Sequence, residues 1–235
     1  MRKVNGPVHR DTLSALGGLA NSYAAAGRQD EALKLREELL ALRRKVLGPE
    51  HPDTIDAMSN LAHSYAAAGR QDEALKMREE VLALSRKVLG PEHPATLSAM
   101  NNVAWTLATS PDAALRDPKR SVELAAQAAK LEPKNANKVG TLGTAQYRAG
   151  DFAAAISTLQ NALSLGKEDG AAHNRFFLAM ARWQAGDKEQ ARKDYDQAVA
   201  AMEKAKGKSA PQDEENLRFQ KEAAALLTEP GEARK

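Results

Sequence analysis

Histidine is the residue type in this chain with the widest chemistry, because its ring can bind a metal or exchange a proton near neutral pH. The five histidines are His9, His51, His63, His93 and His173. Three of them, His9, His51 and His93, are spaced 42 residues apart, so they occupy equivalent places in a repeated sequence and do not converge on one metal. We expect each of these three to lie in a loop between repeats and to bond a backbone group.

The other residue patterns that could take part in catalysis or ligand binding also favour surface roles. Glu37-Glu38 and Glu79-Glu80 stand beside arginines at the spacing of helical surface ion pairs, each worth about 0.2–0.5 kcal/mol. Gly17-Gly18 is not a phosphate loop, because no strand precedes it and no Lys-Ser or Lys-Thr follows. We find no convergent reactive set. The sequence therefore predicts no enzyme, no metal site and no cofactor.

Composition indicates a helical protein and argues against several partner classes. Alanine is abundant, aromatic residues are 4% and charged residues 28%, with a net charge of +3 spread among interleaved acids and bases. This balance argues against nucleic acid, which requires a clustered basic face. There is no cysteine, no run long and apolar enough for a membrane span, and no apolar signal core at the N-terminus. We expect a cytoplasmic protein that does not bind membranes.

A 42-residue block occurs twice in the chain and then a third time in altered form. Residues 12–50 and 54–92 are identical at 30 of 39 aligned positions, without a gap. The third copy starts at Thr96 and keeps the register for about fifteen residues. Internal repetition with this period is typical of stacked helical repeats, in which each unit packs on its neighbours.

Each repeat has the pattern helix, turn, helix. In the second copy the apolar residues of the first helix are spaced as one helical face, and they are Ile55, Met58, Leu61, Ala62 and Tyr65. Gly69 is expected to end this helix in a left-handed conformation, and Asp72 suits the start of the second helix. Gly90-Pro91 would stop the second helix, with Thr96 as the expected cap of the next.

These motifs resemble the tetratricopeptide repeat, and the first two copies resemble its 42-residue kinesin-light-chain variety. The phrases that carry the resemblance are Leu-Gly-Pro-Glu-His-Pro at 47–52, Asn-Leu-Ala-x-x-Tyr at 60–65 and Ala-Gly-Arg-x-Asp-Glu-Ala at 68–74. Shorter units follow, of the ordinary 34-residue kind. The resemblance implies an all-α fold, a right-handed superhelix of about five helix pairs with a C-terminal capping helix.

The segments follow from the same register. We assign a remnant of a preceding repeat and linker to 1–11, repeats to 12–50, 54–92, 96–133, 136–167 and 171–205, and the capping helix to 211–228. The third repeat has a long turn between its helices. Residues 2–9 echo residues 44–51, so either a first unit has decayed or the chain was excised from a longer array.

The C-terminal part has a second resemblance, to the repeat tails of planctomycete-type bacterial serine/threonine kinases. It covers roughly 100–228, and the phrases that carry it lie at 105–112, 115–125, 176–183 and 195–199. It implies a regulatory or recruiting module attached to a signalling protein. The kinase motifs themselves do not occur in this chain.

Partners of stacked helix pairs usually bind on the concave face, which the first helix of each pair lines. From the register we predict a peptide-binding groove with core residues such as Leu16, Leu19 and Tyr23 behind it. The predicted groove residues are Asn21, Asn60, His63, Asn101, Asn102, Trp105, Arg148, Phe176 and Met180.

Several roles in this groove stay open between two interpretations. Asn21, Asn60 and Asn102 would either clamp a peptide backbone, or Asn60 and Asn102 would bond neighbouring repeats. His63 would either contact a ligand or remain solvated. Trp105, Phe176 and Met180 would offer an apolar pocket, while Tyr147 and Trp183 would pack between units. Gly17, Ser59 and Ser98 stand where the cations of carboxylate-gripping repeats would be, which argues against that activity.

The function that the sequence predicts is a non-catalytic module that binds a peptide or protein segment, in a bacterial signalling or scaffolding protein. The alternative is a purely structural repeat segment without its own ligand. In either case we expect a monomer or weak self-association.

Overall fold

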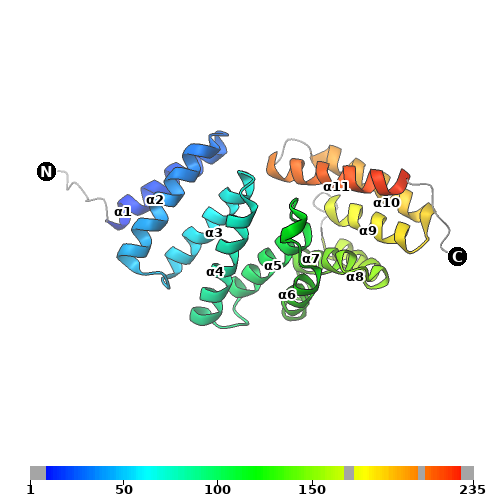
Figure 1. Cartoon of the computed structure of the whole chain (residues 1–235), viewed down its shortest axis with the longest axis horizontal. Helices are drawn as coiled ribbons and strands as arrows, with labels where there is room; N and C mark the ends of the chain where they lie inside the picture. Colours follow the sequence, from blue (N-terminus) through cyan, green and yellow to red (C-terminus); the bar gives the residue numbers. More distant parts are fainter. Residues whose placement is uncertain (1–8, 167–171, 206–209, 229–235) are drawn as a thin grey trace. The chain divides into compact units, whose positions relative to one another are not determined.

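The computed structural model describes residues 9–166, 172–205 and 210–228, and within these ranges the regular structure is entirely helical. The chain divides into two compact units, Met1–Val103 and Ala104–Lys235, with the division inside helix α5 (Pro94–Thr109). The predicted all-α repeat fold is confirmed (Figure 1). Most of the predicted remnant at 1–11 lies outside the described residues.

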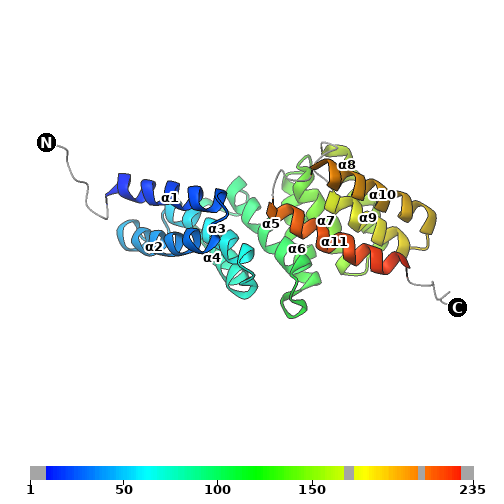
Figure 2. The same ribbon diagram turned by 90° about the horizontal axis from the view of Figure 1, so that it is seen from above.

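The N-terminal unit consists of two helix pairs and the first part of α5. The first pair is α1 (Arg10–Ala25) and α2 (Gln29–Leu47), and the second is α3 (Pro52–Ala67) and α4 (Gln71–Leu89). Helices α1 and α2 pack together, as do α3 and α4, and α2 packs on α3. Figure 2 shows these successive helices side by side. Leu19, predicted as core, is 45% exposed, whereas its equivalent Leu61 is 2% exposed. The difference arises because no described helix precedes α1.

The turn inside each pair uses the same glycine and arginine. Gly27 and Gly69 have φ angles of +77° and +75°, the left-handed conformation predicted for Gly69. The following arginines stack on the tyrosine four residues before each glycine, with Arg28 4.1 Å from the centroid of Tyr23 in the first pair. The same arginine–tyrosine contact therefore supports the turn in both helix pairs.

The three spaced histidines each bond a backbone group, as the sequence predicted, and they do so at the starts of helices. The Nδ1 atoms of His9, His51 and His93 accept hydrogen bonds from the backbone N–H groups two residues later, at 3.1–3.2 Å. The prediction that Thr96 caps α5 is wrong, because the helix begins at Pro94 and the Thr96 hydroxyl donates to the Gly90 carbonyl at 2.8 Å.

The acidic pairs of the second helices join neighbouring repeats. Glu80 pairs with Arg44 at 2.7 Å, and Glu37 accepts a hydrogen bond from the Tyr65 hydroxyl at 3.0 Å. The prediction of ion pairs within one helix is therefore wrong for Glu37 and Glu80. Stacking of the repeats brings the second helix of one pair within reach of the next pair.

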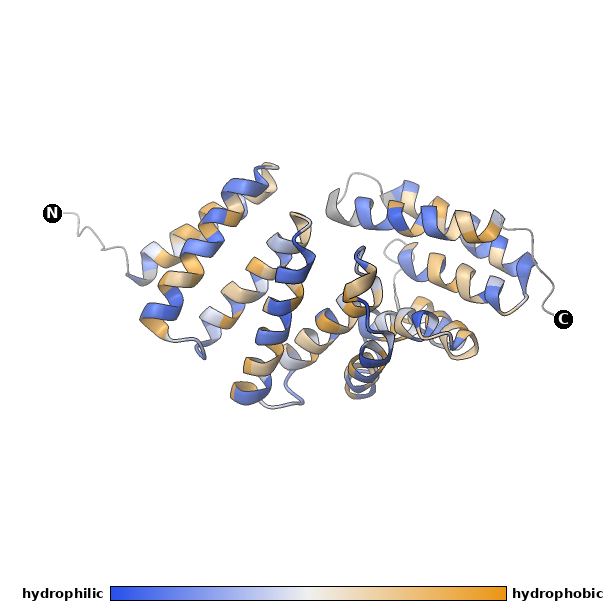
Figure 3. Cartoon of the chain, viewed as in Figure 1, coloured by the Kyte–Doolittle hydropathy of each residue, from blue (hydrophilic) through white to orange (hydrophobic). Residues whose placement is uncertain are grey.

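The C-terminal unit begins with the rest of α5 and continues with α6 (Pro118–Leu131), two complete helix pairs and a last helix. After the 3-10 turn η1 (Ala113–Leu115), which lies in the predicted long turn, come α6, α7 (Ala136–Arg148), α8 (Phe152–Leu165), α9 (Ala172–Gln184), α10 (Lys188–Ala205) and α11 (Ala210–Thr228). Helices α7 and α8 pack together, as do α9 and α10. Hydrophobic and hydrophilic stretches alternate along the helices, as amphipathic packing requires (Figure 3).

Close helix crossings and aromatic contacts hold this unit together. A Cβ atom at Gly143 would lie 2.6 Å from the Leu159 side chain, so the close crossing of α7 and α8 in the fourth repeat requires glycine. Tyr147 contacts Phe177 of the next repeat, with ring centroids 5.6 Å apart, which confirms that it packs between repeats. Trp183 packs with Ala191 of α10 and Leu227 of α11.

Candidate functional site

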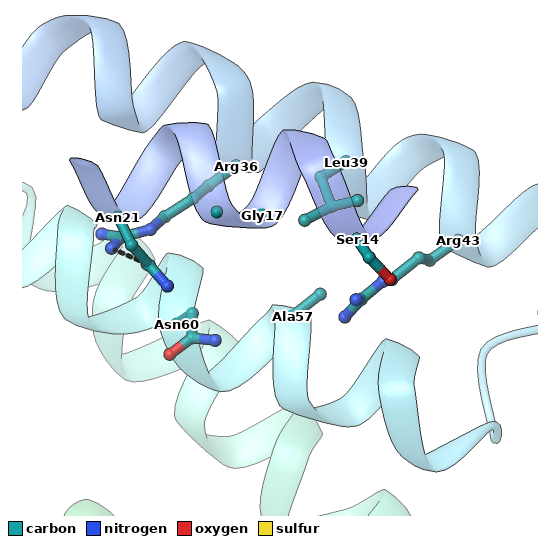
Figure 4. A pocket seen from close by; sticks show the side chains of 9 residues that line it. Ser14, Gly17, Asn21, Arg36, Leu39, Arg43, Ala57 and Asn60 are labelled. Atoms are coloured by element: carbon teal, nitrogen blue, oxygen red, sulfur yellow. Dashed lines mark hydrogen bonds between the residues drawn. The ribbon is translucent and has the colours of Figure 1, made fainter. Parts of the chain in front are cut away.

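The N-terminal unit contains a pocket of about 280 Å³ between α1 and α3, with α2 behind it (Figure 4). Helix α1 contributes its small and polar side, α3 contributes two residues, and α2 contributes two arginines and a leucine. The lining residues are Ser14, Gly17, Gly18, Asn21, Arg36, Leu39, Arg43, Ala57 and Asn60. Two of the predicted groove residues, Asn21 and Asn60, therefore meet at one place.

The two arginines give the pocket a positive charge. Arg36 donates through Nη2 to Asn21 Oδ1 at 3.0 Å (Figure 4). It also donates through Nη1 to the Ser64 hydroxyl. Arg43 donates through Nη1 to the backbone carbonyl of Asp53 at 2.5 Å. Neither arginine pairs with a carboxylate among the residues that the structure describes. Burial lowers the pKa of Arg36, which means that its charge is incompletely solvated.

Further polar groups of the pocket are available to a ligand. The Asn60 side chain is exposed and makes no hydrogen bond to any described residue. The Nε of Arg43 is buried and has no hydrogen-bond partner in the described part of the chain. The apolar side of the pocket is Leu39, which is 5% exposed. The lining thus combines donors, two cations and a small apolar surface, with no carboxylate.

Two glycines inside helix α1 keep the pocket open. Neither Gly17 nor Gly18 has a positive φ, and a Cβ at Gly17 would make only ordinary contact, 3.5 Å from Leu39 Cδ2. A Cβ at Gly18 would meet nothing within 4 Å. Glycine inside a helix costs about 0.5–1 kcal/mol relative to alanine. Neither the backbone angles nor the packing of the described residues requires glycine at these two positions, so they do not explain this loss of helix stability.

The differences between the two nearly identical repeats cluster at this pocket. Seven residues of 12–50 line it, and six of them differ from their counterparts in 54–92, against three of the other 32 aligned positions. Those three exchange one aliphatic or methionine side chain for another. The six lining positions that differ are Ser14, Gly17, Gly18, Asn21, Leu39 and Arg43.

His63, the counterpart of Asn21 in the second repeat, is exposed on α3. Its Nδ1 lies 2.8 Å from the Ser59 carbonyl. Desolvation lowers its pKa, and the charges of Arg78 and Arg36 lower it further, although the bond to Ser59 opposes them. The ring is therefore neutral at pH 7 and adds no charge beside the pocket.

The predicted groove residues on α5 before the unit boundary are less accessible. Asn101 is 7% exposed, and Asn102 is half-buried. Neither lines the pocket. The predicted row of Asn21, Asn60 and Asn102 is thus exposed at Asn21 and Asn60 and half-buried at Asn102.

In the C-terminal unit the chain's own helix α11 lies against the predicted groove residues Trp105 and Arg148. The indole Nε1 of Trp105 donates to Glu215 at 3.0 Å. Arg148 binds both carboxylate oxygens of Glu222, with Nη2 2.8 Å from Oε2. A helix that the sequence assigned only to capping therefore also occupies this face.

The apolar groove residues of this unit are in the core. Phe176 and Met180 are 0% exposed, and they belong to a cluster that includes Phe219 and Ala223 of α11. The expectation that their side chains form an open apolar pocket is wrong for this structure, because α10 and α11 supply the packing that covers them.

The arginines of the pocket were missed from the sequence because they lie on a second helix. Repeat registers place first helices on the concave face, so residues of second helices are assigned elsewhere. The available signal was Arg43, which is serine in the second repeat, seven residues after Arg36 on the same face of α2.

Comparisons with known proteins agree with this architecture. The tetratricopeptide-repeat family models match residues 11–87, 72–127 and 172–204, which together make up more than half of the chain. The chain belongs to the tetratricopeptide-repeat family. Among curated proteins, none matches it.

Solved structures show similar tetratricopeptide folds. A kinesin-light-chain protein of Podosopora anserina with nearly identical repeats is 24% identical, covers 87% of this chain and 100% of its own, and has a TM-score of 0.65. BtubC (BKLC) from P. vanneervenii is 21% identical over 84% of this chain and 82% of its own, with a TM-score of 0.64. A thermophilic repeat protein of Thermus thermophilus is 21% identical, with coverages of 92% and 98% and a TM-score of 0.55. At these identities the similarity establishes the fold.

Metal-binding groups and membrane-spanning helices are two further features that a functional site could use. The described residues contain no group of three or more histidine and acidic side chains placed to hold a metal ion. None of the described helices has the length and hydrophobicity of a membrane span.

Proposed function

We propose that this tetratricopeptide-repeat protein is a non-catalytic interaction module whose N-terminal unit binds a peptide segment that carries an acidic side chain. The proposal depends on one observation: most of the positions at which residues 12–50 and 54–92 differ line a single pocket. Repeats whose helix-packing surfaces are almost unchanged differ where a ligand would lie. A purely structural pair of repeats has no need for such a concentration.

The charge of the pocket selects the ligand class. Arg36 and Arg43 have no carboxylate partner among the described residues, whereas Arg28 and Arg44 each have one and Arg70 has two. A ligand carboxylate would supply the missing counter-ion through charge-assisted hydrogen bonds, which are roughly twice as strong as neutral ones. The free amide of Asn60 would bond the peptide backbone beside it.

The wider setting rests on the sequence alone. The resemblance of residues 100–228 to the tails of bacterial kinases supports a recruiting role in a cytoplasmic signalling protein. In that role the N-terminal unit would select a segment of another protein.

Selection from a peptide library displayed at neutral pH tests the proposal. We expect the recovered peptides to be enriched in Asp or Glu at one position, and Arg43→Gln to weaken their binding about tenfold or more. Arg86→Gln is the matched control, because Arg86 is an exposed arginine of α4 outside the pocket. Equal losses for Arg43→Gln and Arg86→Gln would show that only net charge matters and would refute a specific site.

The alternative, a structural segment without a ligand, makes a different prediction. Light scattering would then show assembly that depends on protein concentration, and the library would yield no peptide. The high identity of the two repeats is compatible with it, but that identity breaks down at the pocket.

A further inference from the structure

Helix α11 contacts more of the C-terminal unit than a cap of the last repeat requires. Capping needs contact with α9 and α10, and α11 packs on both. It also reaches α5 and α7, through residues that are 74 to 110 positions away in the sequence. Most of these more distant contacts are made by polar side chains, and the aromatic contact of Phe219 with Trp105 adds to them.

Three of these polar contacts fix the position of α11. Trp105 donates to Glu215, and Arg148 binds Glu222 with two bonds. In the opposite direction, Arg218 of α11 donates to the backbone carbonyl of Thr109 at 2.5 Å. Polar contacts of this kind specify register and partner, whereas a cap needs only apolar burial.

Arg148, which binds Glu222 of α11, is held in place by residues of the two neighbouring repeats. Arg148 Nε donates to the Ala108 carbonyl at 3.1 Å, and the guanidinium lies 5.1 Å from the centroid of the Phe177 ring. The Arg148 side chain is only 11% exposed. It is thus a buried cation, set to receive a carboxylate, and in this structure Glu222 provides it.

The aromatic anchor of α11 lies between the two carboxylates. Phe219 is 0% exposed and makes edge contacts with Trp105 and Phe177, at centroid distances of 5.9 and 4.9 Å. Glu215, Phe219 and Glu222 are spaced i, i+4 and i+7, so they lie on one face of the helix. This is the spacing by which an amphipathic helix is recognised in a groove.

Trp105 connects this surface with the predicted groove. It is 42 residues after His63 and 84 after Asn21, so the three residues occupy the same groove position in successive repeats. In the third repeat this position binds a helix that is not part of any repeat. The groove position therefore already serves in recognition within the molecule.

We propose that the surface of Trp105, the Thr109 carbonyl, Arg148 and Phe177 is a helix-binding site whose resident occupant, α11, is displaced by a partner helix. The partner that fits is an amphipathic helix of another protein with the pattern Glu-x-x-x-Phe-x-x-Glu. This site is in the other unit from the pocket and does not depend on the proposed function of that pocket.

A tethered occupant determines the design of the test. Because α11 is part of the chain, its effective concentration at the site is high, on the order of millimolar for short tethers. A free helix of equal affinity therefore binds the wild-type chain weakly, and its apparent affinity rises with the fraction of chains whose site is vacant. Weakening α11 only within the chain should strengthen binding of a wild-type peptide.

The experiment uses the full chain and a fluorescently labelled peptide with the sequence of residues 210–228. We expect the chain variant Glu215→Gln/Glu222→Gln to bind this peptide at least about tenfold more tightly than the wild-type chain does. Adding Arg148→Gln to that variant should abolish the gain, because the peptide's own Glu222 then loses its partner. Glu214→Gln, an exposed neighbour on α11, should behave as wild type.

Other outcomes overturn the proposal. If the weakened chain binds the peptide no more tightly than wild type, α11 is a permanent cap. Should the double variant lose helical circular dichroism, Arg218→Gln provides the same test, since it removes the contact of α11 with the Thr109 carbonyl and otherwise changes only contacts of Arg218 with Glu215 and Phe219 within α11 itself. If the wild-type chain forms a dimer that dissociates when the peptide is added, the occupant is the α11 of a second copy. That result would refute the proposal that the partner is another protein.

Discussion

Arg36 and Asn21 are joined across two helices of the first repeat, with the guanidinium Nη2 3.0 Å from Asn21 Oδ1 (Figure 4). The bond holds the end of a long arginine side chain at the side of α1 that lines the pocket. Because its position is fixed in advance, less side-chain entropy is lost when a ligand binds. The amide nitrogen of Asn21 makes no bond to a described residue, so it can still donate to that ligand.

The first testable prediction compares Gly18, which has open space around its Cβ position, with Gly143, which packs closely against Leu159. Gly18→Ala should raise the free energy of unfolding of the N-terminal unit by about 0.5–1 kcal/mol, because the new Cβ meets open space and favours the helix. Gly143→Ala should lower that of the C-terminal unit by about 1–3 kcal/mol, because the Cβ would overlap the Leu159 side chain.

Urea unfolding followed by circular dichroism measures both changes. The two variants make the same chemical change and serve as controls for each other. A loss of stability in Gly18→Ala would show that this glycine has a structural role and would weaken the argument that it keeps the pocket open.

Acid should weaken the C-terminal unit through His173. This half-buried ring lies 5.3 Å from Trp105, and burial lowers its pKa to about 4. The folded state thus favours the neutral ring, so the stabilisation is complete above the unfolded pKa of about 6.5 and is lost as the pH falls toward 4. From pH 7 to pH 5 the loss should be on the order of 2 kcal/mol.

Tryptophan fluorescence measures this effect selectively, because both tryptophans, Trp105 and Trp183, belong to the C-terminal unit. In His173→Gln the difference between pH 7 and pH 5 should shrink by that amount. An unchanged difference would mean that other groups cause the acid sensitivity.

Burial should decide the value of two ion pairs. Arg182 and Asp194 are 13% and 6% exposed and join α9 to α10, whereas Arg44 and Glu80 are 39% and 46% exposed. Asp194→Asn should destabilise the C-terminal unit by about 2–4 kcal/mol, because it leaves a buried cation without its partner. Glu80→Gln should cost at most about 1 kcal/mol. Equal costs in thermal unfolding would contradict this ranking.

Much of the fold could be predicted because the same helix and turn signals occur in both copies of the repeat. The bond of His51 to a backbone group and the left-handed turn at Gly69 each depend on neighbours within one helix pair, and both were predicted. The Thr96 cap was wrong because two helix-start signals lie within a few residues, and proline at the first helical position prevailed.

The candidate site was less predictable, because its decisive contacts are tertiary. A register states which face a residue occupies, but not how far an arginine such as Arg43 reaches from the neighbouring helix. It also does not state that α11 covers Trp105, since no repeat precedent exists for that helix. Leu19 was misplaced for a related reason, because its burial depends on a neighbouring repeat.

Titration calorimetry of a selected acidic peptide against Gly17→Ser/Gly18→Asn tests the central claim most directly. The exchange introduces Ser59 and Asn60 of the second repeat at their equivalent positions, so the fold is expected to accept it, with helix stability raised by a few tenths of a kcal/mol per site. If the pocket binds the peptide, filling it should weaken binding about tenfold or more while the variant unfolds no more easily than wild type. Unchanged affinity in the folded variant would contradict the assignment of this pocket as the binding site.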